Sequence, residues 1–178
     1  MDNKSDKLYY FSKSRNELPG KGINEYITKL SDYKDLSKIE NWRRILSNFH
    51  TSPFVYNDKK YNSVEHAFQA SKINIASPKI AKTFEIDSKS ELGLGDGLMA
   101  RKARKIVVLN KKNIEDWDKI KHETMINIWR AKYAQCEISK KVLLATNNAE
   151  LWHGMMRSRP IRQIGLELVR EEIKKNIK

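Results

Sequence analysis

The stretch from Leu46 to Ile75 changes from extended to helical sequence, and this change constrains the fold more than any other feature of the chain. Its first half places Asn57-Asp58, a turn signal, between two short aromatic segments. This pattern predicts a pair of short strands joined by a turn. From Ser63 onward, the apolar residues recur at helical spacing, so a helix is expected directly after the turn.

Glu65 is expected in the first turn of this helix, because Ser63 is suited to the N-cap position. The positive end of the helix dipole favours an ionised carboxylate there. Gln69 and Lys72 follow one and two turns later on roughly the same face. Such a carboxylate suits a general base or an acceptor for ligand donors. A glutamate in the first turn also commonly does no more than stabilise the helix, so both interpretations remain open on spacing alone.

Helical patterns cover most of the remaining chain, and they predict the fold class. The expected helices are 26–33, 39–46, 78–86, one from about 98, 113–135, 137–146 and 161–176. A short strand is expected at 8–11, and the glycine-dense residues 91–97 are expected to form a loop. The prediction is therefore a mainly α, α-rich α+β fold, built as a helical bundle with a small antiparallel β element near the N-terminus. Residues 1–7 are expected to be a flexible tail, and residues 8–178 a single domain.

The chain is strongly basic, which favours an anionic ligand. It has 35 Lys and Arg against 22 Asp and Glu, a formal net charge of +13. The excess favours a polyanionic partner or an anionic small molecule. The basic residues are dispersed, however, and a biased overall composition would give the same sum. Charge alone therefore does not predict nucleic-acid binding.

Two basic residues lie within or shortly after glycine-containing segments, where a phosphate could be bound. Lys21 lies between Gly20 and Gly22, and glycines let backbone N–H groups approach a phosphate. A solvent-exposed turn is the competing interpretation. Arg101 is expected near the start of the helix that follows the glycine-dense loop, a position suited to an anion. There the alternative is a solvated basic face.

Other classes of chemistry lack their sequence patterns. The four histidines have no metal-site spacing, and HExxH, GxSxG and GxGxxG are absent. Cys136 is the single cysteine, which excludes an internal disulfide, and its surroundings give no sign of activation. Nothing in the sequence requires a metal or a cofactor. With no apolar run of membrane-spanning length and a polar start, the chain is expected to be soluble, intracellular (cytoplasmic) and without a membrane partner.

The segment SVEHAFQASKI, preceded by LSNF, resembles the signature of the YbiA-like or NADAR family of N-glycosidases. Further matches follow in family order, and together they span most of the chain from Tyr9 to Arg170. They are Ala100-Arg101 with Arg104, Trp117 to Lys121, Met125, Ala131-Lys132-Tyr133, Leu143 to Thr146 and Ala149-Glu150-Leu151.

The resemblance implies hydrolysis of a ribosyl N-glycosidic bond, with Glu65 matching the catalytic glutamate of the family. The implied substrate is a phosphorylated, nucleotide-like molecule. Some family members remove ADP-ribose from guanine bases in nucleic acid, and others cleave phosphorylated ribosylamino-pyrimidine intermediates of riboflavin synthesis. Substrate-binding candidates lie in the matched motifs and in the basic and aromatic segments. They are Lys21, Lys72 and Arg101 for phosphate, Phe49, Trp117 and Trp152 for the base, and Asn48 and His153.

Two segments differ from the bacterial members of the family. A long insertion occupies about residues 14–44, and the bacterial acidic residue and Trp-Gly pair near the end are replaced by LWHGMMR. These features resemble a branch found in eukaryotes and large viruses. We expect Trp152 or His153 to face the cavity of Glu65, although packing of Trp152 in the core is the competing interpretation. The rival functions are a non-catalytic module that binds ADP-ribose or a related nucleotide, and a structural protein that binds nucleic acid.

Overall fold

The structure is a computed structural model that describes residues 5–155 and 158–177. Its residues form two compact units, which are described separately. Unit 1 combines the residues up to Ser47 with those from Glu137 onward, and unit 2 is Asn48–Cys136. The expectation of one domain over residues 8–178 stays a prediction.

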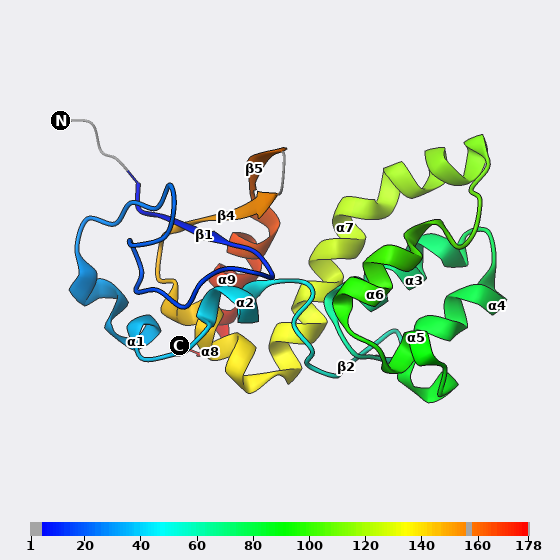
Figure 1. Cartoon of the computed structure of the whole chain (residues 1–178), viewed down its shortest axis with the longest axis horizontal. Helices are drawn as coiled ribbons and strands as arrows, with labels where there is room; N and C mark the ends of the chain where they lie inside the picture. Colours follow the sequence, from blue (N-terminus) through cyan, green and yellow to red (C-terminus); the bar gives the residue numbers. More distant parts are fainter. Residues whose placement is uncertain (1–4, 156–157, 178) are drawn as a thin grey trace. The chain divides into compact units, whose positions relative to one another are not determined.

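Unit 1 is built on a three-stranded sheet in the order β1-β4-β5 (Figure 1). Strand β1 pairs in parallel with β4, and β4 pairs antiparallel with β5 across a register shift between His153 and Met155. Helix α2 packs against β1 and α8, and α9 packs against β4 and α8. The elements are β1 (Lys7–Tyr10), η1 (Leu30–Tyr33), α1 (Lys34–Ser37), α2 (Trp42–Leu46), α8 (Glu137–Ala145), β4 (Glu150–Met155), β5 (Ser158–Arg162) and α9 (Ile164–Ile177).

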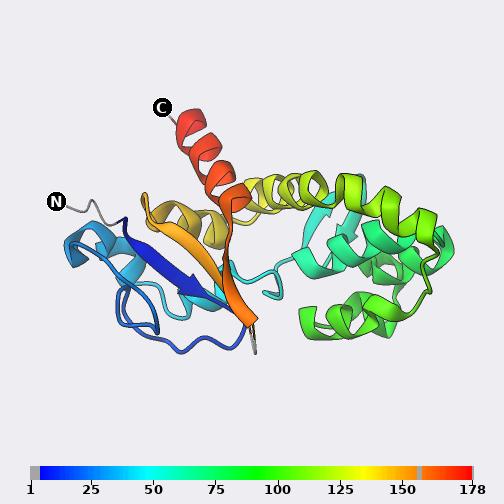
Figure 2. The same ribbon diagram turned by 90° about the horizontal axis from the view of Figure 1, so that it is seen from above.

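Unit 2 is mainly helical and is centred on α3, which packs against α7 and against α6 (Figure 2). Its hairpin β2–β3 pairs Phe54 with Tyr61 and turns at Asn57 and Asp58, which both have positive φ. The elements are β2 (Phe54–Tyr56), β3 (Lys59–Tyr61), α3 (Val64–Asn74), α4 (Pro78–Ala81), η2 (Lys82–Phe84), η3 (Ile86–Ser88), α5 (Glu91–Leu94), α6 (Gly97–Lys102), η4 (Ala103–Lys105) and α7 (Lys111–Gln135).

The predicted fold class is confirmed, since the chain is an α-rich α+β protein with small sheets. The predicted hairpin and the strand near residue 8 are present. The long helix of unit 2 begins earlier than expected, because Asn110 is its N-cap and Asn113 completes a reciprocal capping box with it. Among the described residues, no helix is long and apolar enough to cross a membrane.

Several predicted elements near the ends of the chain are wrong. Strands β4 and β5 lie where no strand was expected, so the final helix begins at Ile164 rather than at 161. The flexible tail expected at residues 1–7 is also too long, because its last residues are held by the fold. Lys7 belongs to β1, and Asp6 accepts hydrogen bonds from Thr28 and Tyr33, while residues 1–4 lie outside the described part. The helix expected at 26–33 is reduced to η1 followed by α1.

Candidate functional site

Helix α3 begins as the sequence predicts and fixes Glu65 at its start. Ser63 is the N-cap, and its side-chain oxygen accepts a hydrogen bond from the backbone N–H of His66. The backbone N–H of Glu65 donates to the carbonyl of Asn48 at 3.0 Å. The imidazole of His66 is fully buried and contacts both the Ser63 hydroxyl and the Leu92 carbonyl. His66 therefore adds two buried contacts that stabilise the start of α3 next to Glu65.

The Glu65 carboxylate is buried and is contacted by one amide and one guanidinium. Glu65 as a whole is only 5% exposed. The amide Nε2 of Gln69, one turn later in α3, donates to Oε1 at 2.8 Å. The Nη1 atom of Arg101 lies 3.7 Å from the same oxygen. Helix geometry supplies the first contact, because residues four apart share a face, and the packing of α6 against α3 supplies the second.

Burial and nearby cations act on the Glu65 carboxylate in opposite directions. Burial raises the pKa of Glu65 above its ordinary value, since desolvation disfavours the charged form. The hydrogen bond from Gln69 and the charges of Arg101, Arg104 and Lys72 pull the pKa back down. Burial and the two arginines in turn lower the pKa of the Lys72 ammonium. A carboxylate whose pKa is raised in this way is a stronger base than an exposed glutamate.

Arg101 occupies a different position from the one predicted. The residues expected to form a glycine-rich loop include helix α5, and α6 then starts at Gly97 with Asp96 as its N-cap. Arg101 therefore stands in the last turn of α6 and not at its start. The helix N-terminus cannot assist it in binding an anion. The Arg101 side chain is nevertheless 46% exposed, so it can contact a substrate while its Nη1 lies near Glu65.

Asn48 and Phe49 lie directly beside the start of α3. The Asn48 side chain is held by α7, because its Oδ1 accepts a hydrogen bond from Trp129 Nε1 at 2.8 Å. This bond fixes the carbonyl that receives the Glu65 N–H. Phe49 lies against the start of α6, since a Cβ added to Gly97 would come within 2.4 Å of the Phe49 Cα. A side chain at position 97 would therefore force α6, and with it Arg101, away from this segment.

Trp117 belongs to the packed interior of unit 2. It is 6% exposed, and its ring meets Phe68 of α3 edge to face, with 5.0 Å between ring centroids. Trp117 is therefore largely a core residue, and its contact with the base of a substrate stays a prediction. Phe68 is one turn from Glu65 and was not singled out in the sequence, because aromatic residues at helical spacing are usually core.

Three of the predicted binding residues belong to unit 1, and two of them lie on its sheet. Trp152 stacks on Tyr9 with 5.8 Å between ring centroids, and its Nε1 donates to Glu150 at 2.9 Å. His153 lies 5.5 Å from the ring of Tyr10. Both side chains of β4 therefore pack against side chains of the paired strand β1. That one of them contacts a nucleotide bound at Glu65 stays a prediction.

The glycine loop around Lys21 does not offer its backbone N–H groups to a ligand. The N–H groups of Gly20 and Gly22 both donate to Oε2 of Glu25, at 2.9 and 3.0 Å. The anion that the loop encloses is therefore an internal carboxylate. Arg43 neutralises this carboxylate through a bidentate ion pair. Lys21 itself is exposed.

A buried lysine in unit 2 was not identified as unusual from the sequence. Lys132 of α7 is 0% exposed, and its Nζ has no hydrogen-bond partner among the described residues. Burial lowers its pKa to about 8. Burial and the Lys132 charge together lower the pKa of His50 to about 4. The position of Lys132 between Trp129 and Tyr133 in the sequence could have indicated its burial. Such burial was not expected, because a lysine is rarely fully buried without a partner.

Among the described residues, no three His, Cys, Asp or Glu side chains come together in a way that could hold a metal ion.

Two comparisons with known proteins give a match, one in sequence and one in fold. The sequence model of the NADAR domain matches residues 36–159, which include Glu65, Gln69, Lys72 and Arg101. The solution structure of the E. coli protein YbiA is similar in fold, with a TM-score of 0.58 and 22% sequence identity. That match covers 76% of this chain and 80% of the E. coli chain. No curated protein sequence matches the chain significantly.

Proposed function

Because the chain belongs to the NADAR domain family, which includes N-glycosidases, we propose that it hydrolyses a ribosyl N-glycosidic bond with Glu65 as the catalytic carboxylate. The observation that carries the proposal is the environment of Glu65. A carboxylate that is 5% exposed, fixed at a helix start and 3.7 Å from an exposed arginine is arranged for chemistry on an anionic substrate. A glutamate that merely stabilises a helix start needs none of this burial.

The reaction breaks the bond between C1′ of the ribose and the nitrogen of the base. The sugar passes through a state that resembles an oxocarbenium ion, which the negative charge of Glu65 stabilises. A water molecule forms the new bond to C1′ and gives one proton to Glu65. The base departs with the electron pair of the broken bond and takes up a proton from solvent, while Glu65 returns its proton to solvent, so one water molecule is consumed and the carboxylate is restored. Burial raises the pKa of Glu65, so its carboxylate accepts this proton more readily than an exposed one.

The cations around Glu65 support a substrate that carries phosphate. Arg101, Arg104 and Lys72 all act electrostatically on the Glu65 carboxylate, so three positive charges act on this one negative charge. The excess positive charge can bind phosphate oxygens through charge-assisted hydrogen bonds. Two substrate classes satisfy this requirement. One is ADP-ribose attached to a guanine base, and the other is a phosphorylated ribosylamino-pyrimidine.

The test offers both substrate classes to the purified protein and identifies the products by mass spectrometry. We expect release of a free base, with the sugar phosphate retaining a new hydroxyl at C1′. Glu65→Gln keeps the side chain's size and should reduce the rate by at least roughly a hundredfold, the usual scale for a lost general base. Glu115→Gln removes an exposed carboxylate of α7 and serves as the matched control.

Binding of the substrate to Glu65→Gln separates hydrolysis from the rival function. A non-catalytic nucleotide-binding module would bind its ligand without converting it, and the variant would keep most of the affinity. Wild-type turnover in Glu65→Gln, or absence of turnover on both substrates, would contradict the proposal. A nucleic-acid-binding structural protein would bind in a strongly salt-dependent way that is indifferent to Glu65.

A further inference from the structure

The connection between η4 and α7 contains a run of four aliphatic residues, 106–109, with the sequence IVVL. None of the four is buried, and Ile106 and Val108 are 54% and 92% exposed. Folding normally removes such side chains from water, because apolar surface left in water is unfavourable. Single exposed apolar residues are common on protein surfaces, but a continuous run of them indicates a contact with something else.

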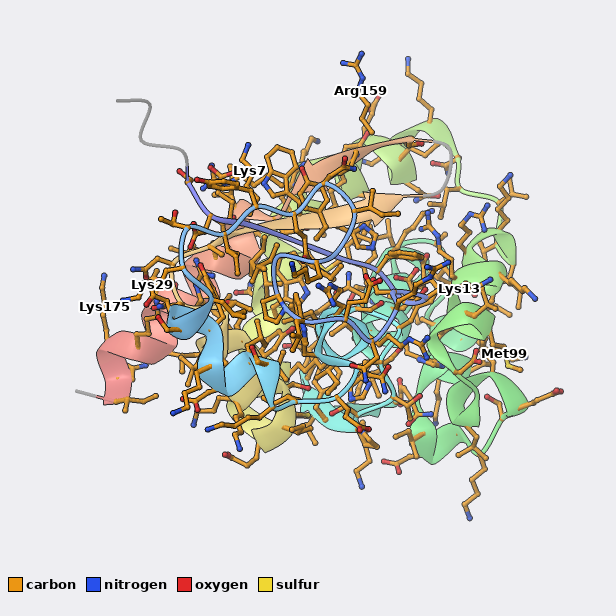
Figure 3. The ribbon with its side chains drawn as sticks, turned by 60° about the vertical axis from the view of Figure 1, so that its left-hand side comes forward. Lys7, Lys13, Lys29, Met99, Arg159 and Lys175 are labelled. Atoms are coloured by element: carbon orange, nitrogen blue, oxygen red, sulfur yellow. The ribbon has the colours of Figure 1, made fainter. Side chains whose placement is uncertain are left out.

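The helices on either side of loop 106–109 also expose apolar side chains. Leu98 and Met99 of α6 are 41% and 36% exposed, and Ile114 of α7 is 47% exposed. Figure 3 shows Met99 at the surface of the molecule. The stretch 97–114 contains no Phe, Tyr or Trp. Its exposed apolar surface therefore consists of flexible chains and offers no flat ring on which a ligand could stack.

The same stretch carries only positive charge. Residues 97–114 include six Lys and Arg and no Asp or Glu. Lys102 and Lys105 lie shortly before the loop, are exposed, and have no side-chain partner among the described residues. A cluster of this kind attracts an anionic surface.

The cations that follow the loop are also available to a partner. The side chains of Lys111 and Lys112 are 93% and 81% exposed, and each pairs with an acid one turn later in α7, at 3.9 and 3.2 Å. Exposed pairs contribute little, so these lysines can exchange them for another anion. Helix α7 is 25 residues long, and the positive end of its dipole lies at the same place.

Hydrogen bonds anchor both ends of the loop. The Asn110 side chain accepts the N–H of Asn113 at 2.8 Å, and the Asn113 side chain accepts the N–H of Asn110 at 3.2 Å. At the other end, the N–H of Ile106 donates to the carbonyl of Ala103 at 3.0 Å. A loop that is anchored in this way loses less freedom on binding than an unattached one.

We infer that loop 106–109 and its flanking lysines dock the protein on a membrane that carries anionic lipids. The aliphatic side chains enter the boundary between headgroups and acyl chains, and the lysines contact the headgroups. Such a contact is peripheral and needs no spanning helix. The absence of a membrane partner was expected from the lack of a spanning segment, which does not bear on a peripheral contact.

Two other kinds of partner fit this surface less well. The core of a protein–protein interface is enriched in aromatic residues and depleted of lysine. A single-stranded nucleic acid stacks its bases on aromatic side chains. Residues 97–114 have lysines and no aromatic residue, so their composition favours a lipid surface. The inference does not require that Glu65 be catalytic.

Co-sedimentation of the full chain with lipid vesicles tests the inference. Vesicles of phosphatidylcholine with about one third phosphatidylserine should bind the chain at least about tenfold more tightly than phosphatidylcholine alone. Lys102→Ala/Lys105→Ala should weaken this binding by about tenfold or more, the scale of two lost headgroup contacts. Val108→Asp should weaken it by at least about tenfold, because it places a charge where an apolar side chain must insert.

Two control variants match these changes. Ile23→Asp places the same charge at an aliphatic residue of unit 1 that is 86% exposed. Lys29→Ala/Lys175→Ala removes two exposed lysines of unit 1, both labelled in Figure 3. Both controls should bind the vesicles as the wild type does, and so should Glu65→Gln. All the control and test variants except Glu65→Gln change exposed side chains, and circular dichroism verifies that each variant folds.

Absence of binding to the anionic vesicles would overturn the inference. Equal losses in the control variants would also overturn it, because the binding would then depend on net charge alone. The same holds if Val108→Asp binds as tightly as the wild type. An oligonucleotide offered in place of vesicles gives the remaining outcome. If the chain binds it through Lys102, Lys105 and Val108 but does not bind vesicles, the surface belongs to nucleic acid and the inference is wrong.

Discussion

The Nη1 atom of Arg101 lies 3.7 Å from Oε1 of Glu65, so the residue proposed to bind phosphate and the proposed catalytic base form one ion pair. The two residues differ in their access to solvent. The Arg101 side chain is 46% exposed and that of Glu65 is 7% exposed. Arg101 therefore has room to bind a substrate while its charge still acts on the buried carboxylate, and one substitution should affect both binding and ionisation.

Arg101→Ala should weaken substrate binding and move the pH profile of hydrolysis. Loss of one charge-assisted contact corresponds to about 1.5–3 kcal/mol of binding free energy. Arg101 lowers the pKa of Glu65, so its removal raises that pKa. Because a general base must be deprotonated, the acid limb of the kcat/KM profile should move to higher pH. Steady-state kinetics from pH 4 to pH 8 measure both effects.

Two further variants control this experiment. Arg101→Lys retains a positive charge and should shift the profile less than Arg101→Ala. Lys102→Ala removes the exposed cation next in the sequence and should leave both affinity and profile unchanged. Unchanged affinity for the phosphorylated substrate in Arg101→Ala would mean that Arg101 is a solvated surface residue.

Gln69→Met tests the hydrogen bond that holds the Glu65 carboxylate. The amide of Gln69 donates to Oε1 of Glu65 and lowers its pKa, so the methionine variant should also move the acid limb to higher pH. Turnover should fall as well, because the carboxylate loses its orientation. Stability should also fall, by about 1.5–3 kcal/mol, because the buried Glu65 carboxylate loses a hydrogen bond. An unaltered pH profile would show that Glu65 is not the group whose titration controls the rate.

Arg43→Met should destabilise unit 1 strongly. Nη2 and Nε of Arg43 contact the two oxygens of Glu25 at 2.7 and 2.9 Å, and both side chains are almost completely buried. Without Arg43 the Glu25 carboxylate is left buried and uncompensated, which typically costs about 3–5 kcal/mol. Urea unfolding of wild type and variant gives this difference directly.

The exposed pair Lys38–Asp35 provides the comparison for this effect. Its side chains are 64% and 77% exposed, so Lys38→Met should change the unfolding free energy by no more than about 0.5 kcal/mol. Equal effects of Arg43→Met and Lys38→Met would contradict the structural role given to the Arg43–Glu25 pair.

Local sequence signals predicted the elements that depend on nearby residues. Ser63 and Glu65 are placed correctly because an N-cap and a first turn involve residues only a few positions apart. The β2–β3 hairpin follows from its turn residues in the same way. The pairing of β1 with β4 joins residues about 140 positions apart, so neither strand carries a local signal for its partner.

The glycine loop shows a second limit of sequence reasoning. Gly20 and Gly22 direct their N–H groups at an anion, but this anion is the carboxylate of Glu25 and not the phosphate that the sequence suggested. The identity of that anion depends on Glu25 and on the distant Arg43, which only the folded chain brings together. The same limit applies to Arg101, whose position near Glu65 depends on the packing of α6 against α3.

Lys132→Met should stabilise the protein at neutral pH and remove part of the pH dependence of its stability. Burial lowers the pKa of Lys132 from 10.5 to about 8. Between these values the unfolded chain binds a proton that the folded chain does not, so the unfolding free energy of the wild type should rise with pH above about 8. Tyr33, Tyr61 and Tyr133 have raised pKa values and oppose this trend above pH 10, so the useful window is pH 8 to 9.5.

The methionine variant has no ammonium to desolvate, so it should lack this rise and should be more stable at pH 7 by roughly 1–3 kcal/mol, since one pKa unit corresponds to 1.36 kcal/mol. The measurement is urea unfolding at several pH values, compared with Lys140→Met, an α8 lysine that is not fully buried. NMR titration of His50 supplies an independent reading. The Lys132 charge helps to lower the pKa of His50 to about 4, so that pKa should rise in Lys132→Met. A His50 titration that does not move would mean that the Lys132 ammonium is not charged beside it.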